Sequence, residues 1–134
     1  MTENERSLIE ELEALGALPW ERGMLVEVRG SMGKEILTIQ DVDTALETLE
    51  FHNPYLYGIK SASMKICTHA PCDALIGYLV GRLQGTKHNL EIRCYSDHAI
   101  VEWRKHPAAP LCFKGKTLLE ALLLAFAAML EAEK

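Results

Sequence analysis

Hydrophobic residues recur at helical spacing near the start and in the middle of the chain. Near the start, residues 2–15 open on Thr2 and Glu5, a pair of side chains that forms a capping box, and the apolar stripe ends before Gly16. In the middle, residues 71–84 open on a proline and then place apolar side chains at helical spacing. Because the first stretch is apolar on one side only, we expect a surface helix that rests this face on a core, and the second stretch predicts a longer helix.

The most hydrophobic stretch is residues 118–130, which is apolar at every position except Glu120. Thr117 and Glu120 form a second capping box, so the pattern predicts a helix. The stretch is too short to cross a hydrocarbon layer of ~30 Å, which takes about 20 residues. A helix that is apolar all round must be covered on two sides, by the chain's own sheet and another helix or by a second protein molecule. The side chains that we expect at an interface with a second molecule are Leu123, Phe126 and Leu130.

Runs of β-branched and aliphatic residues around Gly30 and Gly33 predict a first β-hairpin, and alternating apolar and polar positions predict a second hairpin and one further strand. The first hairpin joins residues 24–29 to residues 35–40, and the second joins residues 90–95 to residues 99–104. A single strand follows Ile59, with Ala62, Met64 and Ile66 on its buried face. In the second hairpin we expect Arg93 and Arg104 on the face in contact with water and Cys94 on the buried face.

Between the first hairpin and the single strand, Asp41 is placed to cap a short helix that runs to about Glu50. The predicted order of elements is therefore α-ββ-α-β-α-ββ-α. Such an order is typical of an α+β fold, in which a mostly antiparallel sheet is packed by helices. We expect residues 1–134 to form a single domain, because the length falls within the usual range for one.

Composition agrees with an ordinary globular protein, since 49% of the residues are hydrophobic and 25% are charged. The first residues are acidic, whereas a secretory signal begins with basic residues and continues with apolar ones, so we expect a cytoplasmic protein. The four cysteines are then expected to be reduced thiols.

Charge is distributed unevenly along the chain. Residues 1–57 carry twelve acidic and four basic side chains, whereas residues 58–134 carry seven acidic and ten basic ones. Such asymmetry is an argument about partners rather than about fold. The acidic side chains Glu10 and Glu13 of the first helix are candidates for contact with a basic partner.

An aromatic loop provides a second candidate surface for a partner. Residues 52–58 contain an Asn-Pro step and a glycine, which predict a loop, together with Tyr55 and Tyr57. Tyrosines are good binding anchors at interfaces. The alternative is that both rings fold back onto the core.

The cysteines and histidines are arranged poorly for metal binding or nucleophilic catalysis. Cys67, His69 and Cys72 lack the close cysteine pairs of zinc knuckles, and Cys72 and Cys94 are expected to be small core residues. Cys67 is expected to point away from the buried face, but no motif of a cysteine hydrolase surrounds it. We therefore predict no metal site, no cofactor and no catalytic residue.

Residues 114–117, Lys-Gly-Lys-Thr, are similar to the end of a phosphate-binding loop, but the first glycine and the preceding strand of that motif are missing. Plain binding of a nucleotide-like anion remains an alternative, because a helix N-terminus attracts anions. The basic side chains available to such an anion are Arg93, Arg104, Lys114 and Lys116. Nucleic acid is not expected as a partner, since Glu91 and Glu102 share the hairpin face with the two arginines.

The segment from Leu90 to Trp103, followed by a loop and by residues 115–125, resembles the closing part of small phage-encoded α/β sandwich proteins. In those proteins a hairpin precedes a helix that opens with a Gly-x-[Thr/Ser]-Leu-x-Glu-Ala step. The resemblance covers the C-terminal third and implies a phage or prophage context and a helix packed across a sheet. It transfers no functional residues.

From these observations we expect a non-enzymatic protein-binding module that self-associates, with a homodimer as the expected assembly. In a phage context, the sharper form of this hypothesis is an inhibitor of a host defence protein. The alternative is a protein that binds or sequesters a nucleotide or another small anion.

Overall fold

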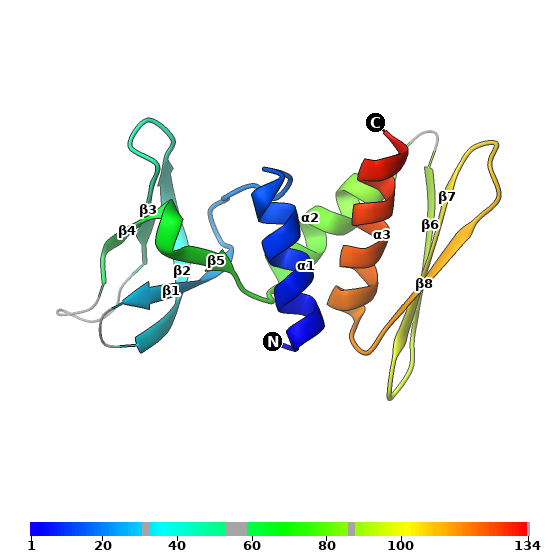
Figure 1. Ribbon diagram of the computed structural model, residues 1–134, viewed down its shortest axis with the longest axis horizontal. Coiled ribbons are helices and arrows are strands. Elements are labelled where there is room, and N and C mark those ends of the chain that lie inside the picture. The colour runs from blue at the N-terminus through cyan, green and yellow to red at the C-terminus, as the bar shows by residue number, and fades with distance from the viewer. Residues whose placement is uncertain (31–32, 53–58, 86–87, 134) are drawn as a thin grey trace. The chain divides into compact units, whose positions relative to one another are not determined.

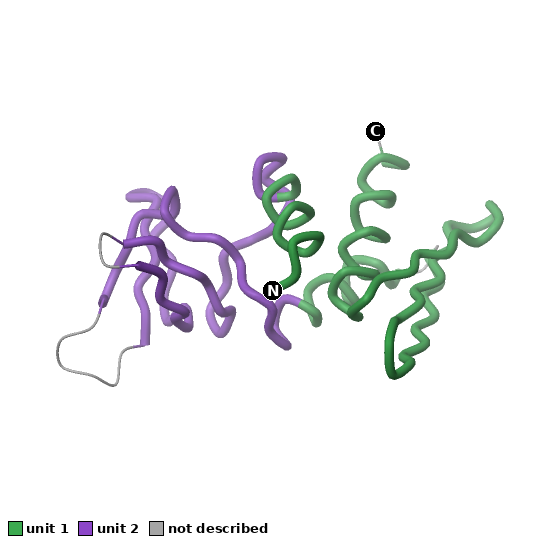
Figure 2. Tube along the Cα trace, turned by 60° about the horizontal axis from the view of Figure 1, so that its bottom comes forward, with its two compact units in different colours: residues 1–12, 76–134 green, residues 13–75 purple. Residues whose placement is uncertain are grey.

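A computed structural model of the chain describes residues 1–30, 33–52, 59–85 and 88–133. The chain, predicted as a single domain, divides into two compact units (Figure 2). One, which we call the helix–sheet unit, contains residues 1–12 and 76–134, and the other, the five-stranded unit, contains residues 13–75. The α+β fold class predicted from the sequence is confirmed.

The helix–sheet unit contains a three-stranded antiparallel sheet and a long C-terminal helix, together with most of two further helices (Figure 1). Its strands pair in the order β6-β7-β8, so β7 is central. The elements are α1 (Glu3–Ala14), α2 (Asp73–Leu83), β6 (His88–Cys94), β7 (Ala99–Lys105), β8 (Leu111–Gly115) and α3 (Leu118–Ala132). The second hairpin and the last helix are thus confirmed.

Helix α3 is covered from within its own unit. On one side it packs on β7 and β8, whose inward side chains include Val101 and Trp103. On the other side the ring of Phe126 meets Tyr78 of α2 edge-on at 6.1 Å. Leu123 and Phe126 are fully buried by these contacts, whereas Leu130 is half-buried. A subunit interface built on Leu123 and Phe126 is therefore wrong for this conformation, because the chain itself occupies both side chains.

The one polar residue in the apolar stretch, Glu120, closes the start of α3. Its backbone amide donates to Oγ1 of Thr117 at 3.1 Å, which confirms the capping pair. Its carboxylate accepts from the amide of Lys116 at 3.1 Å and from the side chain of Asn4 in α1 at 3.1 Å. Glu120 is buried, and these bonds offset the cost of burying its charge. The capping box of α1, Thr2 with Glu5, is also confirmed.

Gly115 is required for packing between the end of β8 and the first turn of α3. A Cβ atom at this position would lie 2.6 Å from the backbone nitrogen of Ala121 and 2.9 Å from Cβ of Glu120. Both distances are shorter than real Cβ contacts. The glycine of the Gly-Lys-Thr sequence therefore serves close packing of a strand against a helix.

We expect Gly115→Ala to lower the free energy of unfolding by about 1–3 kcal/mol, the usual cost of overpacking. The matched control is Gly77→Ala in α2, where an added Cβ meets nothing within 4 Å. That change should leave stability unchanged or raise it by up to about 1 kcal/mol, because alanine favours helices. Urea denaturation of both variants measures the difference, and equal stability of the two would refute the packing role.

The five-stranded unit is an antiparallel sheet with strands in the order β4-β3-β2-β1-β5. Its elements are β1 (Leu25–Gly30), β2 (Gly33–Asp43), β3 (Thr48–Phe51), β4 (Ser61–Ser63), a 3-10 turn (Met64–Ile66) and β5 (Cys67–His69). The first hairpin is confirmed as β1 and β2, which pair from Leu25 with Thr38 to Gly30 with Gly33. Buried side chains of this sheet include Val26, Val28 and Ile39.

The short helix expected over residues 41–50 is wrong. Strand β2 continues to Asp43, the chain turns, and β3 returns with Leu49 opposite Val42. The Asp43 carboxylate accepts from the amide of Leu46 at 3.0 Å, so it closes a turn instead of a helix. The apolar spacing of these residues also fits a hairpin, in which Leu49 is buried and Leu46 is 72% exposed.

The single strand expected after Ile59 is interrupted by the 3-10 turn, and this reverses the predicted direction of Cys67. The turn shifts the alternation, so Ile66 is exposed while Cys67 and His69 are buried. The prediction that Cys67 points away from the core is therefore wrong. The prediction that Cys94 is buried is also wrong. Its side chain shares the helix side of the sheet with Ala99, but Cys94 ends the edge strand β6 and is exposed.

Candidate functional site

The face of the three-stranded sheet opposite α3 gathers most of the charged side chains singled out in the sequence. Residues directly opposite one another in an antiparallel pair lie on the same face, and the register therefore defines this surface. We call it the open face, and its side chains are Asn89, Glu91, Arg93, Ile100, Glu102, Arg104, Cys112 and Lys114. All of them are exposed or half-exposed.

Two carboxylates face each other at the centre of the open face. Glu91 on β6 lies directly opposite Glu102 on β7, and Cys112 on β8 lies opposite Glu102 on its other side. Glu102 is 3.8 Å from the guanidinium of Arg93 and 3.8 Å from the thiol of Cys112. The carboxylate of Glu91 makes no hydrogen bond or ion pair with another described residue. Like charges placed directly opposite each other destabilise a strand pair, so this arrangement favours the arrival of a cation.

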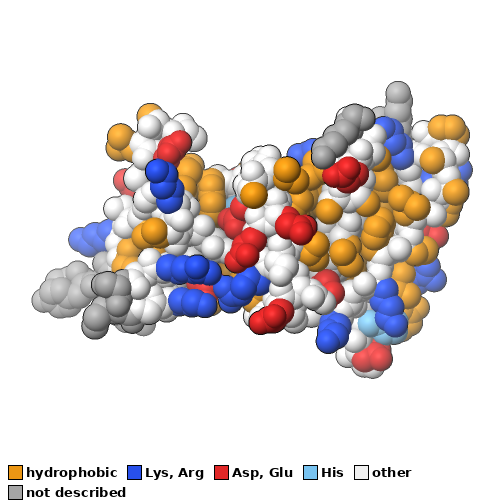
Figure 3. Space-filling view, viewed as in Figure 1, with side chains coloured by type: hydrophobic (Ala, Val, Ile, Leu, Met, Phe, Trp, Pro, Cys, Tyr) orange, Lys and Arg blue, Asp and Glu red, His pale blue; other side chains and the backbone are white. Residues whose placement is uncertain are grey.

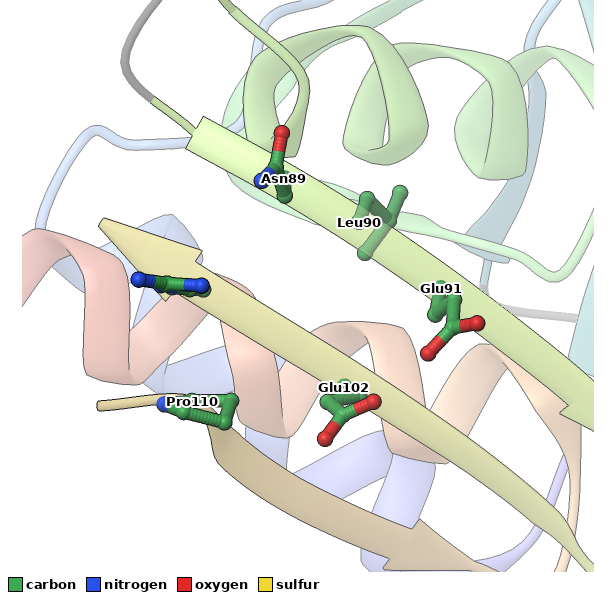
Figure 4. A pocket seen from close by; sticks show the side chains of 6 residues that line it. Asn89, Leu90, Glu91, Glu102 and Pro110 are labelled. Carbon is green, nitrogen blue, oxygen red and sulfur yellow. The ribbon is translucent and has the colours of Figure 1, made fainter. Parts of the chain in front are cut away.

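A hollow of about 410 Å³ lies beside these carboxylates (Figure 4). Its lining combines the two glutamates with an amide, a guanidinium and two apolar side chains: Asn89, Leu90, Glu91, Glu102, Arg104 and Pro110. Figure 4 shows Glu91 and Glu102 side by side on neighbouring strands. The hollow can therefore hold a side chain with an apolar stem and a charged or hydrogen-bonding end.

The four basic residues considered for anion binding do not converge on one point. Arg93 approaches Glu102, and Nε of Arg104 donates to the carbonyl of Ala108 at 3.0 Å. Lys114 belongs to the open face, but Lys116 follows β8 and lies outside it. The amide of Lys116 already donates to Glu120, so this donor at the start of α3 is not available to a phosphate.

The tip of the β6–β7 hairpin is held by a pair of neighbouring residues. Nδ1 of His98 lies 2.6 Å from a carboxylate oxygen of Asp97, and its ring stacks on Tyr95 at 4.6 Å. The hydrogen bond with His98, followed by the charge of the same ring, lowers the pKa of the Asp97 carboxyl from its ordinary value. These contacts order the turn that fixes the register of the open face.

Cys67 and His69 do not form a catalytic pair. The Cys67 thiol donates to the carbonyl of Ser63 at 3.3 Å, while burial and then the charge of Glu13 raise its pKa to about 11. A thiol with a raised pKa is a poor nucleophile at neutral pH. His69 is fully buried, with Nδ1 2.8 Å from Glu13 and Nε2 2.6 Å from the carbonyl of Pro19. Both ring nitrogens therefore have structural partners.

Metal binding finds no support in the part of the chain that the structure describes. No group of three or more His, Cys, Asp or Glu side chains lies close enough there to hold an ion.

Two further hollows, of about 500 and 430 Å³, lie in the five-stranded unit and share Gln40 and Glu50 in their linings. None of the described helices is long and apolar enough to cross a membrane.

The structure treats the remaining candidates for partner contact differently: one is exposed, one is already bonded and two lie outside the described residues. Glu10 is exposed on α1 and stays a candidate. Glu13 is wrong as a free contact residue, because His69 occupies its carboxylate. Tyr55 and Tyr57 lie outside the described residues.

The pairing of Glu91 with Glu102 was not predicted as a feature in its own right, and Asn89 and Pro110 were not predicted as residues of the site. The alternation of β6 and β7 carried the signal for the glutamates, since it already placed both on the face in contact with water.

No family model, curated protein or solved structure matches the chain.

Proposed function

We propose that this protein is a non-enzymatic protein-binding module and that the open face is its binding surface. The observation that carries the proposal is the opposed pair Glu91 and Glu102 beside a hollow. A lysine or arginine of a partner protein would place its charged end between the two carboxylates. Its methylene stem would lie against Pro110, an apolar side chain of the lining.

We also propose that the protein is not an enzyme, and the hydrogen bonds of its buried polar groups support this part of the proposal. The buried polar side chains Glu5, His69 and Glu120 are each occupied by structural hydrogen bonds. In the described residues, every buried side-chain nitrogen and oxygen has a hydrogen-bond partner. Groups held in this way support the fold, and we take this as support for a role outside catalysis.

The resemblance of the C-terminal third to phage proteins extends the proposal. The partner would be a host protein in the cytoplasm, and binding would inhibit it. The alternative function, binding of a nucleotide-like anion, has less support, because Glu91 and Glu102 stand between Arg104 and Arg93 on the open face.

A peptide-display selection on the immobilised protein tests the proposal. We expect the selected peptides to carry a lysine or arginine. The variant Glu102→Gln should bind a synthetic copy of such a peptide about tenfold or more weakly, the loss expected when a hydrogen bond to a charged group is removed. The control is Glu35→Gln, which removes an exposed glutamate from β2 in the other unit.

Two results would contradict the proposal: selected peptides without basic residues, or equal affinity of wild type and Glu102→Gln. A thermal-shift panel of mono-, di- and cyclic nucleotides addresses the alternative. At one hundred times its dissociation constant a ligand stabilises by about 2.7 kcal/mol, so an anion binder would respond clearly. We expect no response from this protein.

A further inference from the structure

The outer edge of β6 is an unpaired strand edge with a defined set of free backbone groups. Among the described residues β7 is the one strand that pairs with β6, and only the first residue of β6, His88, has a further bridge, to Gly85. At the hairpin the amide of Tyr95 donates to the carbonyl of His98 at 2.8 Å, so these two residues form a hydrogen-bonded position of the ladder. Because hydrogen-bonded pairs alternate along an antiparallel ladder, Arg93, Glu91 and Asn89 also bond to β7. The amides and carbonyls of the alternate residues Leu90, Ile92 and Cys94 therefore point outward.

The side chains along this edge differ between the two faces of the sheet. On the helix side, Leu90, Ile92 and Cys94 form an apolar rim in which Ile92 is 37% exposed and Cys94 is exposed. Figure 3 shows hydrophobic side chains gathered in the region of the view where β6 to β8 and α3 lie. On the open face, the edge carries Glu91 and Arg93, which have opposite charges and both are exposed.

We propose that two copies of this chain pair through their β6 strands, antiparallel and related by a twofold axis, with Ile92 opposite Ile92 of the second copy. In this register Leu90 lies opposite Cys94 of the second copy, and the outward amides and carbonyls of both edges meet. Glu91 lies opposite Arg93 of the second copy, and this ion pair forms twice. The two apolar rims join into one strip, and the sheets merge into a six-stranded sheet.

Charge selects this register over its neighbours. A twofold centred on Glu91 places this glutamate opposite its own copy, and one centred on Arg93 does the same for the arginine, so both are repulsive. A shift by a single residue would bring apolar side chains opposite polar ones on the wrong face. Only pairing centred on Ile92 combines apolar contact on one face with opposite charges on the other.

The other sheet edges carry features that protect against pairing. β8 contains Lys114 and is preceded by Pro110, and charged or proline residues are typical protection for an edge strand. The edges of the five-stranded sheet, β4 and β5, are only three residues long. β6 is seven residues long, and its charges complement those of a second copy. An isologous pair of β6 edges is thus the assembly that this chain fits.

A charge-swap experiment tests the pairing by light scattering after size exclusion and by equilibrium sedimentation. The wild type should be a dimer, and Glu91→Arg and Arg93→Glu should each weaken it about tenfold or more, since each creates two like-charge contacts. The double variant Glu91→Arg/Arg93→Glu should restore the dimer. The control is Glu35→Arg on β2, which should leave the dimer intact.

Hydrogen exchange provides a second measurement that does not depend on charge. The amides of Leu90, Ile92 and Cys94 should be protected from exchange in the wild type and should exchange rapidly in the single variants. Circular dichroism checks that the single variants are folded. A wild type that stays monomeric at high concentration would overturn the proposal. A dimer unaffected by either single variant, or one that the double variant fails to restore, would also overturn it. Partner binding by the open face is tested separately, because Glu102 does not lie on the β6 edge.

Discussion

Replacing Leu123 with aspartate is expected to unfold the helix–sheet unit. Leu123 is fully buried in α3, the helix that packs on β7 and β8. The change removes a buried leucine, which costs about 2–5 kcal/mol, and adds a charge without a partner, which costs several more. Since whole domains are stable by only about 5–15 kcal/mol, the loss approaches the full free energy of unfolding.

Circular dichroism and urea denaturation measure this effect. The matched control is Leu46→Asp, because Leu46 is 72% exposed in the turn between β2 and β3. The control should change stability by no more than about 0.5 kcal/mol, as is usual for a surface position. A folded Leu123→Asp variant with near-native stability would mean that α3 is not the centre of its unit.

Replacing His69 with leucine is expected to lower the free energy of unfolding by about 3–5 kcal/mol, the cost of breaking a buried pair by removing one partner. The imidazole is fully buried, stacks on Trp20 at 4.0 Å, and bridges the carboxylate of Glu13 and the carbonyl of Pro19. Leucine has a similar volume but offers no donor. The Glu13 carboxylate would keep the backbone amide of residue 69, which donates to it at 3.3 Å, but both oxygens would lose their contact with the ring.

A double-mutant cycle isolates the pair from the rest of the site. We expect the double variant His69→Leu/Glu13→Leu to lose about 1–3 kcal/mol less free energy of unfolding than the sum of the two single changes. The reason is that the Glu13 carboxylate, which loses its imidazole partner in His69→Leu, is absent from the double variant. His52→Leu, at an exposed histidine of the same unit, is the control and should have little effect. Strictly additive costs would show that the hydrogen bond between His69 and Glu13 contributes nothing.

Local signals in the sequence were sufficient for the parts of the fold that depend on near neighbours. The capping pairs Thr2–Glu5 and Thr117–Glu120 each act over three residues, and both are present in the structure. Both hairpins were also predicted, the first from its β-branched and aliphatic runs on either side of Gly30 and Gly33 and the second from alternation. The covered state of α3 followed from its lack of any polar face.

The errors fall where one pattern serves two structures. Residues 41–50 fit both a short helix and a hairpin, and only pairing with neighbouring strands decides between them. The 3-10 turn at residues 64–66 reverses the alternation by its length, so Cys67 is buried instead of exposed. The contact of Glu13 with His69 joins residues 56 positions apart, and such a long-range pair leaves no local signal.

The candidate site was predicted in part. Alternation placed Arg93 and Arg104 on one face with Glu91 and Glu102, and the register confirms that they share it. What alternation cannot give is which residues lie opposite one another, and this decides the chemistry. With Glu91 facing Glu102, the centre of the open face carries two opposed carboxylates, and on this arrangement we base the proposal of a basic partner, whereas the basic residues alone had indicated an anion.

The most direct test of the open face as a binding surface is a nuclear magnetic resonance titration of the nitrogen-labelled protein with a selected lysine- or arginine-bearing peptide. We predict that the largest chemical-shift changes fall on the amides of Glu91, Glu102 and Arg104, which line one hollow. Changes centred instead on α1 near Glu10, or on the five-stranded unit, with these three amides unmoved, would contradict the proposed binding surface.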